Sequence, residues 1–158
     1  MTAYNLELFA DYFQFYVQDD DRTIGDLSSA WTPEAVDHLL AVGPGVVGVG
    51  TVRNMNVPVT IEIHDREPPG DLDLWEHVTE CGLEVRTGRL VVAGCTDYFP
   101  DAKRIQVGPG IYKVRVSCGG LDTLSEDGLE GDDRYRLQLW PAQSIGSPQV
   151  VKQRRSSS

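Results

Sequence analysis

Alternation between apolar and polar residues is the dominant pattern along the chain. Apolar residues occupy every second position from Val57 to Ile63, and the same spacing recurs from Tyr112 to Val116 and from Tyr135 to Leu139. A two-residue period is typical of a strand with one buried face. Further strands are predicted at residues 12–18, 46–53, 77–85, 89–95 and 104–107.

Turn-forming segments separate these strands. Arg53–Asn56, Thr87-Gly88 and Gly108-Pro109-Gly110 interrupt the apolar pattern, and Gly, Pro and Asn favour turns. Many short strands divided by such turns are typical of a sandwich or a barrel. The sequence therefore predicts an all-β fold, a two-sheet antiparallel β-sandwich, with one short helix.

The helix is predicted over about residues 33–42. Thr32 is a favourable N-cap and Pro33 suits the first helical position. Gly43-Pro44-Gly45 would end the helix. Its apolar stripe consists of Val36, Leu39 and Leu40.

Glycines mark one face of the strand that follows. Gly48 and Gly50 are two residues apart, so both lie on the same face. Without side chains there, another backbone or a bulky ring is expected to pack closely on this strand.

The pattern predicts one domain and a tail. Residues 1–145 form the single β-sandwich domain, and the chain length fits one domain of ordinary size. Residues 146–158 form a basic, Ser-rich tail that ends in Arg154-Arg155 and three serines. In this tail Val150 and Val151 are candidates for a short edge strand, with disorder expected beyond it.

Acidity narrows the classes of partner. The 158 residues include 14 basic and 24 acidic residues, for a net charge of −10. Because Lys152, Arg154 and Arg155 lie in the tail, residues 1–150 alone carry a net charge of −13. Such a surface repels phosphate backbones and anionic membranes, and it attracts a basic protein. We therefore expect no direct nucleic-acid binding and no membrane binding, although acidity for solubility alone is the alternative.

The N-terminus and the cysteines indicate the cytoplasm. Met1–Glu7 lacks a basic segment followed by an apolar stretch, so it does not read as a secretory signal. Cys81, Cys95 and Cys118 are odd in number and widely spaced, which predicts neither a disulfide framework nor a zinc site.

Motifs for catalysis are missing from the sequence. It contains no phosphate-binding loop, no GxSxG elbow and no HExxH or HxH spacing. We therefore predict a binding protein with no catalytic residues, no metal ligands and no cofactor. An enzyme with an unrecognised carboxylate site is kept as an alternative. A pocket that holds Asp97, Asp101 or His77 would favour it, and Cys95–Asp101 is the best segment in which to look.

Two acidic segments are the predicted partner-binding surface. Trp75 lies inside one of them, and an aromatic residue in a charged loop is typical of an interface hot spot, although Trp75 could instead close one end of the core. Residues 122–133 form the other, which carries six carboxylates and no basic residue. A third acidic run, at residues 19–26, could converge on the same end. The predicted contacts are Asp71, Asp73, Trp75, Glu76, Asp122, Glu126, Asp127, Glu130, Asp132 and Asp133.

Calcium binding is the alternative use of these loops. Clustered carboxylates suit a hard cation. However, the EF-hand order fails, because aligning Gly128 with the required glycine puts Thr123 and Ser125 at the first and third ligands. A calcium- or ligand-binding sandwich adaptor therefore stays as the second function class, and a solvated loop without a role as the third interpretation of residues 122–133.

Several segments together resemble a known family. They are Tyr12–Asp19, Trp31–Val36, Gly45–Asn54, Ile105–Tyr112 and Asp133–Tyr135. In order and spacing they are similar to the competence protein J family of bacteria, whose named activity is inhibition of the DNA-entry nuclease. The resemblance spans most of residues 10–140 and implies an immunity-like inhibitor whose carboxylates cover the basic cleft of a nuclease or toxin.

Overall fold

The computed structural model describes residues 1–154, which form two β-sheets and one short helix. Sheet A has six strands, in spatial order β1 (Thr2–Phe9), β5 (Asn56–Ile63), β10 (Arg134–Pro141), β9 (Gly110–Gly119), β6 (His77–Val85) and β11 (Gln149–Lys152). Sheet B has five, in spatial order β3 (Leu40–Gly43), β4 (Val46–Gly50), β2 (Gln14–Asp19), β7 (Arg89–Gly94) and β8 (Lys103–Gln106). The helices are α1 (Pro33–His38) and the 3-10 turns η1 (Asp11–Phe13), η2 (Leu72–Leu74) and η3 (Phe99–Asp101).

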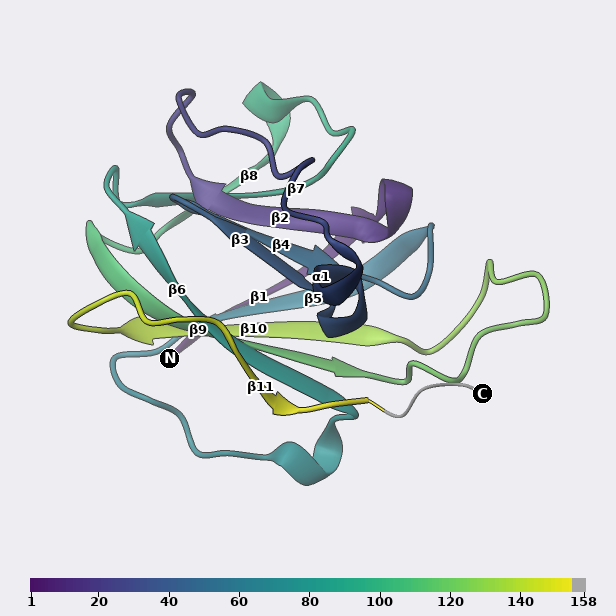
Figure 1. Ribbon diagram of the computed structural model, residues 1–158. Helices are drawn as coiled ribbons and strands as arrows, with labels where there is room; N and C mark the ends of the chain where they lie inside the picture. Colours follow the sequence, from purple (N-terminus) through teal and green to yellow (C-terminus); the bar gives the residue numbers. More distant parts are fainter. Residues whose placement is uncertain (155–158) are drawn as a thin grey trace.

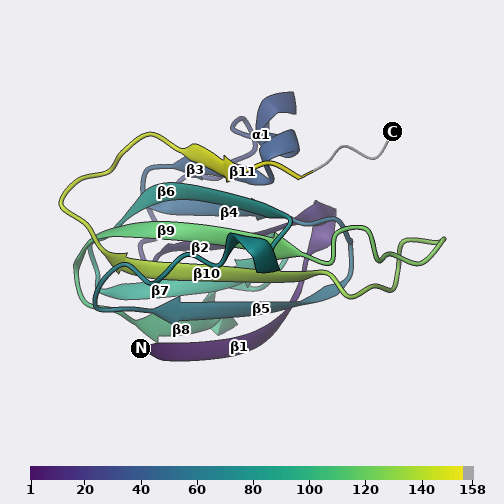
Figure 2. The same cartoon turned by 90° about the horizontal axis from the view of Figure 1, so that it is seen from below.

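One hydrophobic core lies between the two sheets. Sheet B lies above sheet A in Figure 1. Figure 2 views the molecule from below, so that sheet A lies in front. Alternate residues of most strands, such as Phe15 of β2 and Leu137 of β10, are buried in one shared cluster. The ring of Phe15 meets that of Tyr135 edge-on, with 6.1 Å between centroids, so the two sheets contact each other directly. The other face of each strand is left for loops and for a functional surface.

The wholly antiparallel arrangement predicted from the sequence is wrong for sheet A. Strand β10 pairs in parallel with β5, in the register Tyr135 to Val59 and Leu139 to Ile63. Every pair in sheet B is antiparallel. Two strands were also missed: β1 pairs with β5, and β3 pairs with β4. Alternation identifies a strand and its buried face but not its neighbour, because pairing depends on residues far away in the sequence.

The helix is shorter than predicted. It begins as expected, since the Thr32 hydroxyl accepts a hydrogen bond from the Ala35 N–H. It ends at His38, because Leu39 adopts a left-handed conformation (φ 54°) and Leu40 already pairs with Val49. Strand pairing and burial of Leu40 thus override the helical spacing of the apolar stripe.

The first predicted strand is shorter too. Residues 12–18 were expected to be one strand, but β2 begins at Gln14. Tyr12 and Phe13 both have positive φ values, 58° and 62°, which no strand accommodates. They form part of η1 instead, where two large aromatic rings project outward.

The C-terminal segment follows the edge of sheet A. Strand β11 pairs with β6, with a shift of register between Val150 and Lys152. The disorder predicted at the end of the tail concerns residues beyond Arg154, which lie outside the described part of the chain. Within residues 1–154, no helix has the length and apolarity needed to cross a membrane.

Candidate functional site

Trp75 joins the two acidic segments. It follows η2, is nearly buried, and its ring lies between two guanidinium groups. The Cζ atoms of Arg134 and Arg136 lie 4.5 and 4.6 Å from the ring centroid. Both arginines belong to β10, on the outer face of sheet A, so Trp75 fastens the η2 segment to that face. Stacking of this kind contributes about 0.5–2 kcal/mol for each cation.

An ion pair completes this attachment. Asp71 accepts two hydrogen bonds of 2.7 Å from the guanidinium of Arg136. These bonds hold the pKa of Asp71 below its ordinary value, so its carboxylate stays charged. Asp71 is thus engaged within the chain and is less available to a partner than its neighbour Asp73, which is exposed.

Hydrogen bonds bring the second acidic segment to the same place. Glu76 accepts a bond of 3.1 Å from the Leu121 N–H, at the start of the loop between β9 and β10. At the end of that loop, Arg134 donates a 2.6 Å bond to the Leu74 carbonyl. The η2 segment therefore contacts both ends of the second loop, and their acidic residues lie together.

The loop between β9 and β10 holds its own shape. Thr123 receives a bond of 2.8 Å from the Asp132 N–H, which ties the two arms together. Nearer the tip, the Ser125 N–H donates to the Glu130 carbonyl at 2.8 Å. Asp127 accepts bonds from Ser125 and Leu129, which lower its pKa. The loop extends away from both sheets in Figures 1 and 2.

The predicted contact residues divide into two groups. Asp73 and five carboxylates of the loop point to solvent, and this exposed set is Asp73, Asp122, Glu126, Asp127, Glu130 and Asp132. Asp133, in contrast, is fully buried: Arg53 lies 2.8 Å from one of its oxygens, and Tyr135 donates a 2.9 Å bond to the other. Asp133 therefore stabilises the base of the loop and does not face a partner.

The third acidic run lies elsewhere. Asp19 is buried, and it accepts bonds from the backbone of Arg86 and Thr87, just beyond the end of β6. Trp75 lies just before the start of β6, and the nine residues of that strand span roughly 30 Å. Two of the three acidic segments thus meet, and Asp19 of the third lies at the opposite end.

The described residues do not assemble a set of ligands for calcium. Among residues 1–154, no three His, Cys, Asp or Glu side chains are grouped so as to hold a metal ion. The enzymatic alternative looked for a pocket holding Asp97, Asp101 or His77, and Asp97 lines the hollow described below, while Asp97 and Asp101 line a smaller one. His77 is instead buried, with its Nε2 2.6 Å from the His38 carbonyl.

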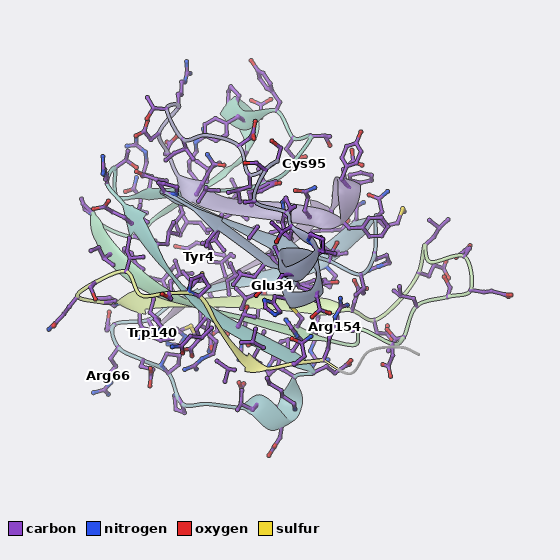
Figure 3. The ribbon with its side chains drawn as sticks, viewed as in Figure 1. Tyr4, Glu34, Arg66, Cys95, Trp140 and Arg154 are labelled. Atoms are coloured by element: carbon purple, nitrogen blue, oxygen red, sulfur yellow. The ribbon has the colours of Figure 1, made fainter. Side chains whose placement is uncertain are left out.

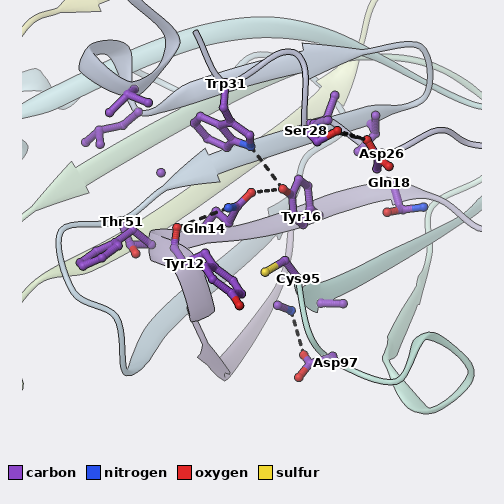
Figure 4. A pocket seen from close by; sticks show the side chains of 18 of the residues that line it. Tyr12, Gln14, Tyr16, Gln18, Asp26, Ser28, Trp31, Thr51, Cys95 and Asp97 are labelled. Carbon is purple, nitrogen blue, oxygen red and sulfur yellow. Dashed lines mark hydrogen bonds between the residues drawn. The ribbon is translucent and has the colours of Figure 1, made fainter. Parts of the chain in front are cut away.

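A hollow that the sequence analysis did not predict lies on the outer face of sheet B. It has a volume of about 1000 Å³, and its floor includes Tyr16 of β2, Gly50 of β4 and Ala93 of β7. The expectation that a ring packs on the glycine face is confirmed, because Trp31 lies over Gly48. The Trp31 indole donates a 3.2 Å bond to the Tyr16 hydroxyl, which is also bonded to Gln14 (Figure 4).

Strained aromatic residues form one rim of the hollow. Tyr12 and Phe13 are 69 % and 52 % exposed, and each has the left-handed backbone that costs a non-glycine residue roughly 1–2 kcal/mol. Hydrogen bonds hold this backbone: Phe13 donates to Ala10, and Thr51 donates to the Phe13 carbonyl at 2.9 Å. Strain combined with exposed rings is more typical of a functional surface than of a core.

Cys95 lies beside this rim, next to β2 in Figure 3. Burial raises the pKa of its thiol, and the carboxylates of Asp11 and Asp97 raise it further. The thiol donates to the Asp11 carbonyl at 3.3 Å. It therefore stays protonated at neutral pH and is a poor nucleophile.

Comparison with known proteins establishes the fold. No family model matches the chain, and no curated protein matches it. Among solved structures, it is similar to the crystal structure of ComJ, inhibitor of the DNA degrading activity of NucA, from Bacillus subtilis. That similarity has a TM-score of 0.62 at 17 % identity, over 90 % of this chain and 96 % of the other. The chain has a ComJ-like fold.

A second structure shares this fold. The protein described as crocagin biosynthetic gene J matches 90 % of this chain and 100 % of its own length, with a TM-score of 0.59 and 17 % identity. The ComJ-like fold thus occurs in proteins with different descriptions, and function has to be argued from the surface.

Proposed function

We propose that this protein is a nuclease inhibitor that binds a basic protein through the joined acidic segments. The observation that carries the proposal is the contact of η2 with both ends of the loop between β9 and β10. This contact gathers six exposed carboxylates at one end of the molecule: Asp73, Asp122, Glu126, Asp127, Glu130 and Asp132.

The chemistry of the partner follows from these carboxylates. A DNA-degrading nuclease has a basic cleft for phosphates, and carboxylates on an ordered loop can take the place of those phosphates. Because the loop keeps its shape through internal hydrogen bonds, less ordering entropy is lost on binding. Arg134 contributes a positive charge to this surface, but its guanidinium is engaged with Trp75 and Leu74.

Fold similarity supports the same partner class. ComJ is an inhibitor of the DNA degrading activity of NucA. As part of the proposal, the two sheets form a β-sandwich, supported by the buried cluster to which both contribute. We also propose that residues 1–145 are its single domain and that the protein is a non-enzymatic bacterial protein. Its three free cysteines support a location in the cytoplasm.

The test is inhibition of DNA degradation by a purified non-specific nuclease from the native host. A charge variant replaces Asp122, Glu126, Glu130 and Asp132 by their amides. The matched control replaces four exposed acids elsewhere, Glu7, Glu34, Glu67 and Asp101, so that net charge falls equally. We expect the loop variant to need at least about tenfold more protein for half-inhibition, with the control unchanged.

Two results would contradict the proposal. Equal weakening by the loop variant and the control would mean that the acidity serves general charge alone. Absence of inhibition and of binding by the unmodified protein would remove the nuclease as a partner.

Raising the salt concentration should also slow association steeply, because steering by exposed charges is screened.

A further inference from the structure

One rim of the hollow on sheet B, formed by Tyr12, Phe13 and Thr51, lies at the same end of the molecule as the acidic loop. Thr51, on its lip, donates a backbone bond to Phe13, and the neighbouring Val52 donates to the Tyr135 hydroxyl at the base of the loop. Figure 1 shows η1, the β4–β5 turn and the acidic loop side by side at the right. A protein seated on the loop can therefore extend a side chain into the hollow.

The walls of the hollow are aromatic and come from separate parts of the chain. Tyr12 and Phe13 precede β2, Tyr16 lies on β2, Trp31 precedes α1, and Phe99 belongs to η3. Rings that surround a space from several sides suit a flat cation with an apolar stem.

Negative charge lies among these rings. Asp26 and Asp97 both line the hollow, on either side of Tyr16 (Figure 4). Hydrogen bonds from Ser28 lower the pKa of Asp26, so its carboxylate is charged. The Tyr16 pKa is raised, first by burial and also by Asp26. The field of this carboxylate therefore reaches the interior of the hollow.

Arg154 is the positively charged residue among the described lining residues. The backbone N–H of Arg154 donates to His77, and His77 in turn lies against the His38 carbonyl at the end of α1. Helix α1 packs next to β3, whereas Asp97 follows β7. Strands β3 and β7 are three spacings apart in sheet B, roughly 14 Å. Arg154 thus lies away from Asp97, and Arg104, the arginine beside Phe99, is held by Asp20 and by the Phe99 carbonyl.

The chain itself repeatedly stacks arginine on aromatic rings. Arg104 lies 5.0 Å from the centroid of Phe99, and Arg115 lies 4.9 Å from that of Trp140. Together with the stack at Trp75, these contacts show that aromatic rings near carboxylates in this protein accommodate guanidinium groups. An arginine side chain is small beside 1000 Å³, so the hollow has room for the adjoining backbone as well.

We propose that this hollow binds an arginine side chain, carried on an exposed loop of the basic partner. The rings of Tyr12, Tyr16 and Trp31 contact its stem and its guanidinium plane, and Asp26 and Asp97 supply the counter-charge. The strained aromatic rim is thereby explained as a preformed wall. The identity of the partner rests on the proposed function, but the binding chemistry does not.

The experiment is an NMR titration with the peptide Ac-Gly-Arg-Gly-NH2. Its matched control is the same peptide with citrulline, which keeps the shape of arginine and lacks its charge. We expect saturable shifts of the Trp31 indole N–H and of the Gly50 and Ala93 amides, with the citrulline peptide at least about tenfold weaker. A lysine peptide should bind more weakly than the arginine peptide, because an ammonium stacks less well.

Two variants test the residues. Asp26→Asn with Asp97→Asn keeps an acceptor oxygen for the turn bonds from Ser28 and Gly94 and removes both charges. Tyr12→Gly with Phe13→Gly removes two walls and relieves the positive φ values. Each pair should weaken arginine binding at least about tenfold while the remaining spectrum stays native.

Several outcomes would overturn the inference. They are equal binding of the arginine and citrulline peptides, absence of saturable shifts, and binding that both variants leave unchanged. The two proposals fail separately. Peptide binding without nuclease inhibition removes only the proposed function, and inhibition without peptide binding removes only the arginine site.

Discussion

Arg136 binds Asp71 through two parallel hydrogen bonds of 2.7 Å, and this pair connects a central strand to a segment 65 residues earlier. The guanidinium is only 12 % exposed and the carboxylate 30 % exposed. Bidentate geometry and partial burial make this pair stronger than an ordinary surface ion pair.

Breaking this pair should destabilise the protein measurably. Asp71→Ala leaves the Arg136 guanidinium without its acceptor, and we expect a loss of about 1–3 kcal/mol in the free energy of unfolding by urea. The control is Glu84→Ala, which removes the partner of the exposed Arg86 and should cost less than about 0.5 kcal/mol. Equal effects would mean that the η2 segment is held by Trp75 alone.

The backbone of Tyr12 offers a second test. Tyr12→Gly should keep the free energy of unfolding within about 1 kcal/mol of the unmodified protein, because relief of the positive φ offsets the added freedom of the unfolded chain. Tyr12→Val should be less stable than Tyr12→Gly by about 1–2 kcal/mol, since a β-branched residue disfavours this conformation. Thermal unfolding of the two variants measures the difference. A valine variant as stable as the glycine variant would contradict the strain.

Close packing at Gly94 provides a third test. A Cβ atom at this position would overlap the Phe9 carbonyl oxygen, which belongs to the backbone. Gly94→Ala should therefore destabilise the protein by about 2–4 kcal/mol, because β7 or the end of β1 must move. Gly70→Ala has open space around it and is the matched control. Urea unfolding of both variants decides, and similar stabilities would contradict the packing.

His77 should make stability depend on pH. Burial lowers its pKa, and although the His38 carbonyl raises it, the positive Arg154 lowers it further. The neutral ring uses both nitrogens: Nε2 donates to the His38 carbonyl at 2.6 Å, and Nδ1 accepts from the Arg154 N–H at 3.1 Å. A protonated Nδ1 can no longer accept, so the bond to the C-terminal segment is lost.

The sign follows from linkage. The unfolded state binds a proton on His77 below about pH 6.5, while the folded state resists it, so stability is full above that pH and falls as pH drops through the lower folded pKa. Urea unfolding between pH 7.5 and 5, with His77→Gln as the control, measures this slope. The protection of the amides of residues 150–154 against hydrogen exchange, relative to their intrinsic exchange rates at each pH, should fall over the same range. A slope that persists in His77→Gln would assign it to other groups.

The alternation of residues was enough to predict most strands, because Val57–Ile63 and Tyr135–Leu139 each bury one face. It could not predict that these two strands pair in parallel, since nothing local distinguishes one neighbour from another. Leu40 belonged equally well to a helical stripe and to a strand, and only its pairing with Val49 decides.

The candidate site, too, was predicted only where it depends on local sequence. Trp75 and its acidic neighbours were recognised from local composition, but the burial of Asp133 depends on Arg53, 80 residues earlier. Gly48 and Gly50 indicated close packing on one strand face, but they did not predict the hollow that lies there. Its rim was not predicted either, because Tyr12 and Phe13 read as part of a strand and their left-handed backbone is fixed by Ala10 and Thr51.

The parallel pairing of β5 with β10 also governs how the chain is completed during synthesis. Strand β5 leaves the ribosome early, with β1 on one side and an open hydrogen-bonding edge on the other. That edge stays unsatisfied until Pro141 has been synthesised, because β10 is its neighbour. The nascent chain thus carries a strand with an unpaired edge from the synthesis of Ile63 until that of Pro141, and an unpaired edge exposes the chain to aggregation unless a chaperone covers it.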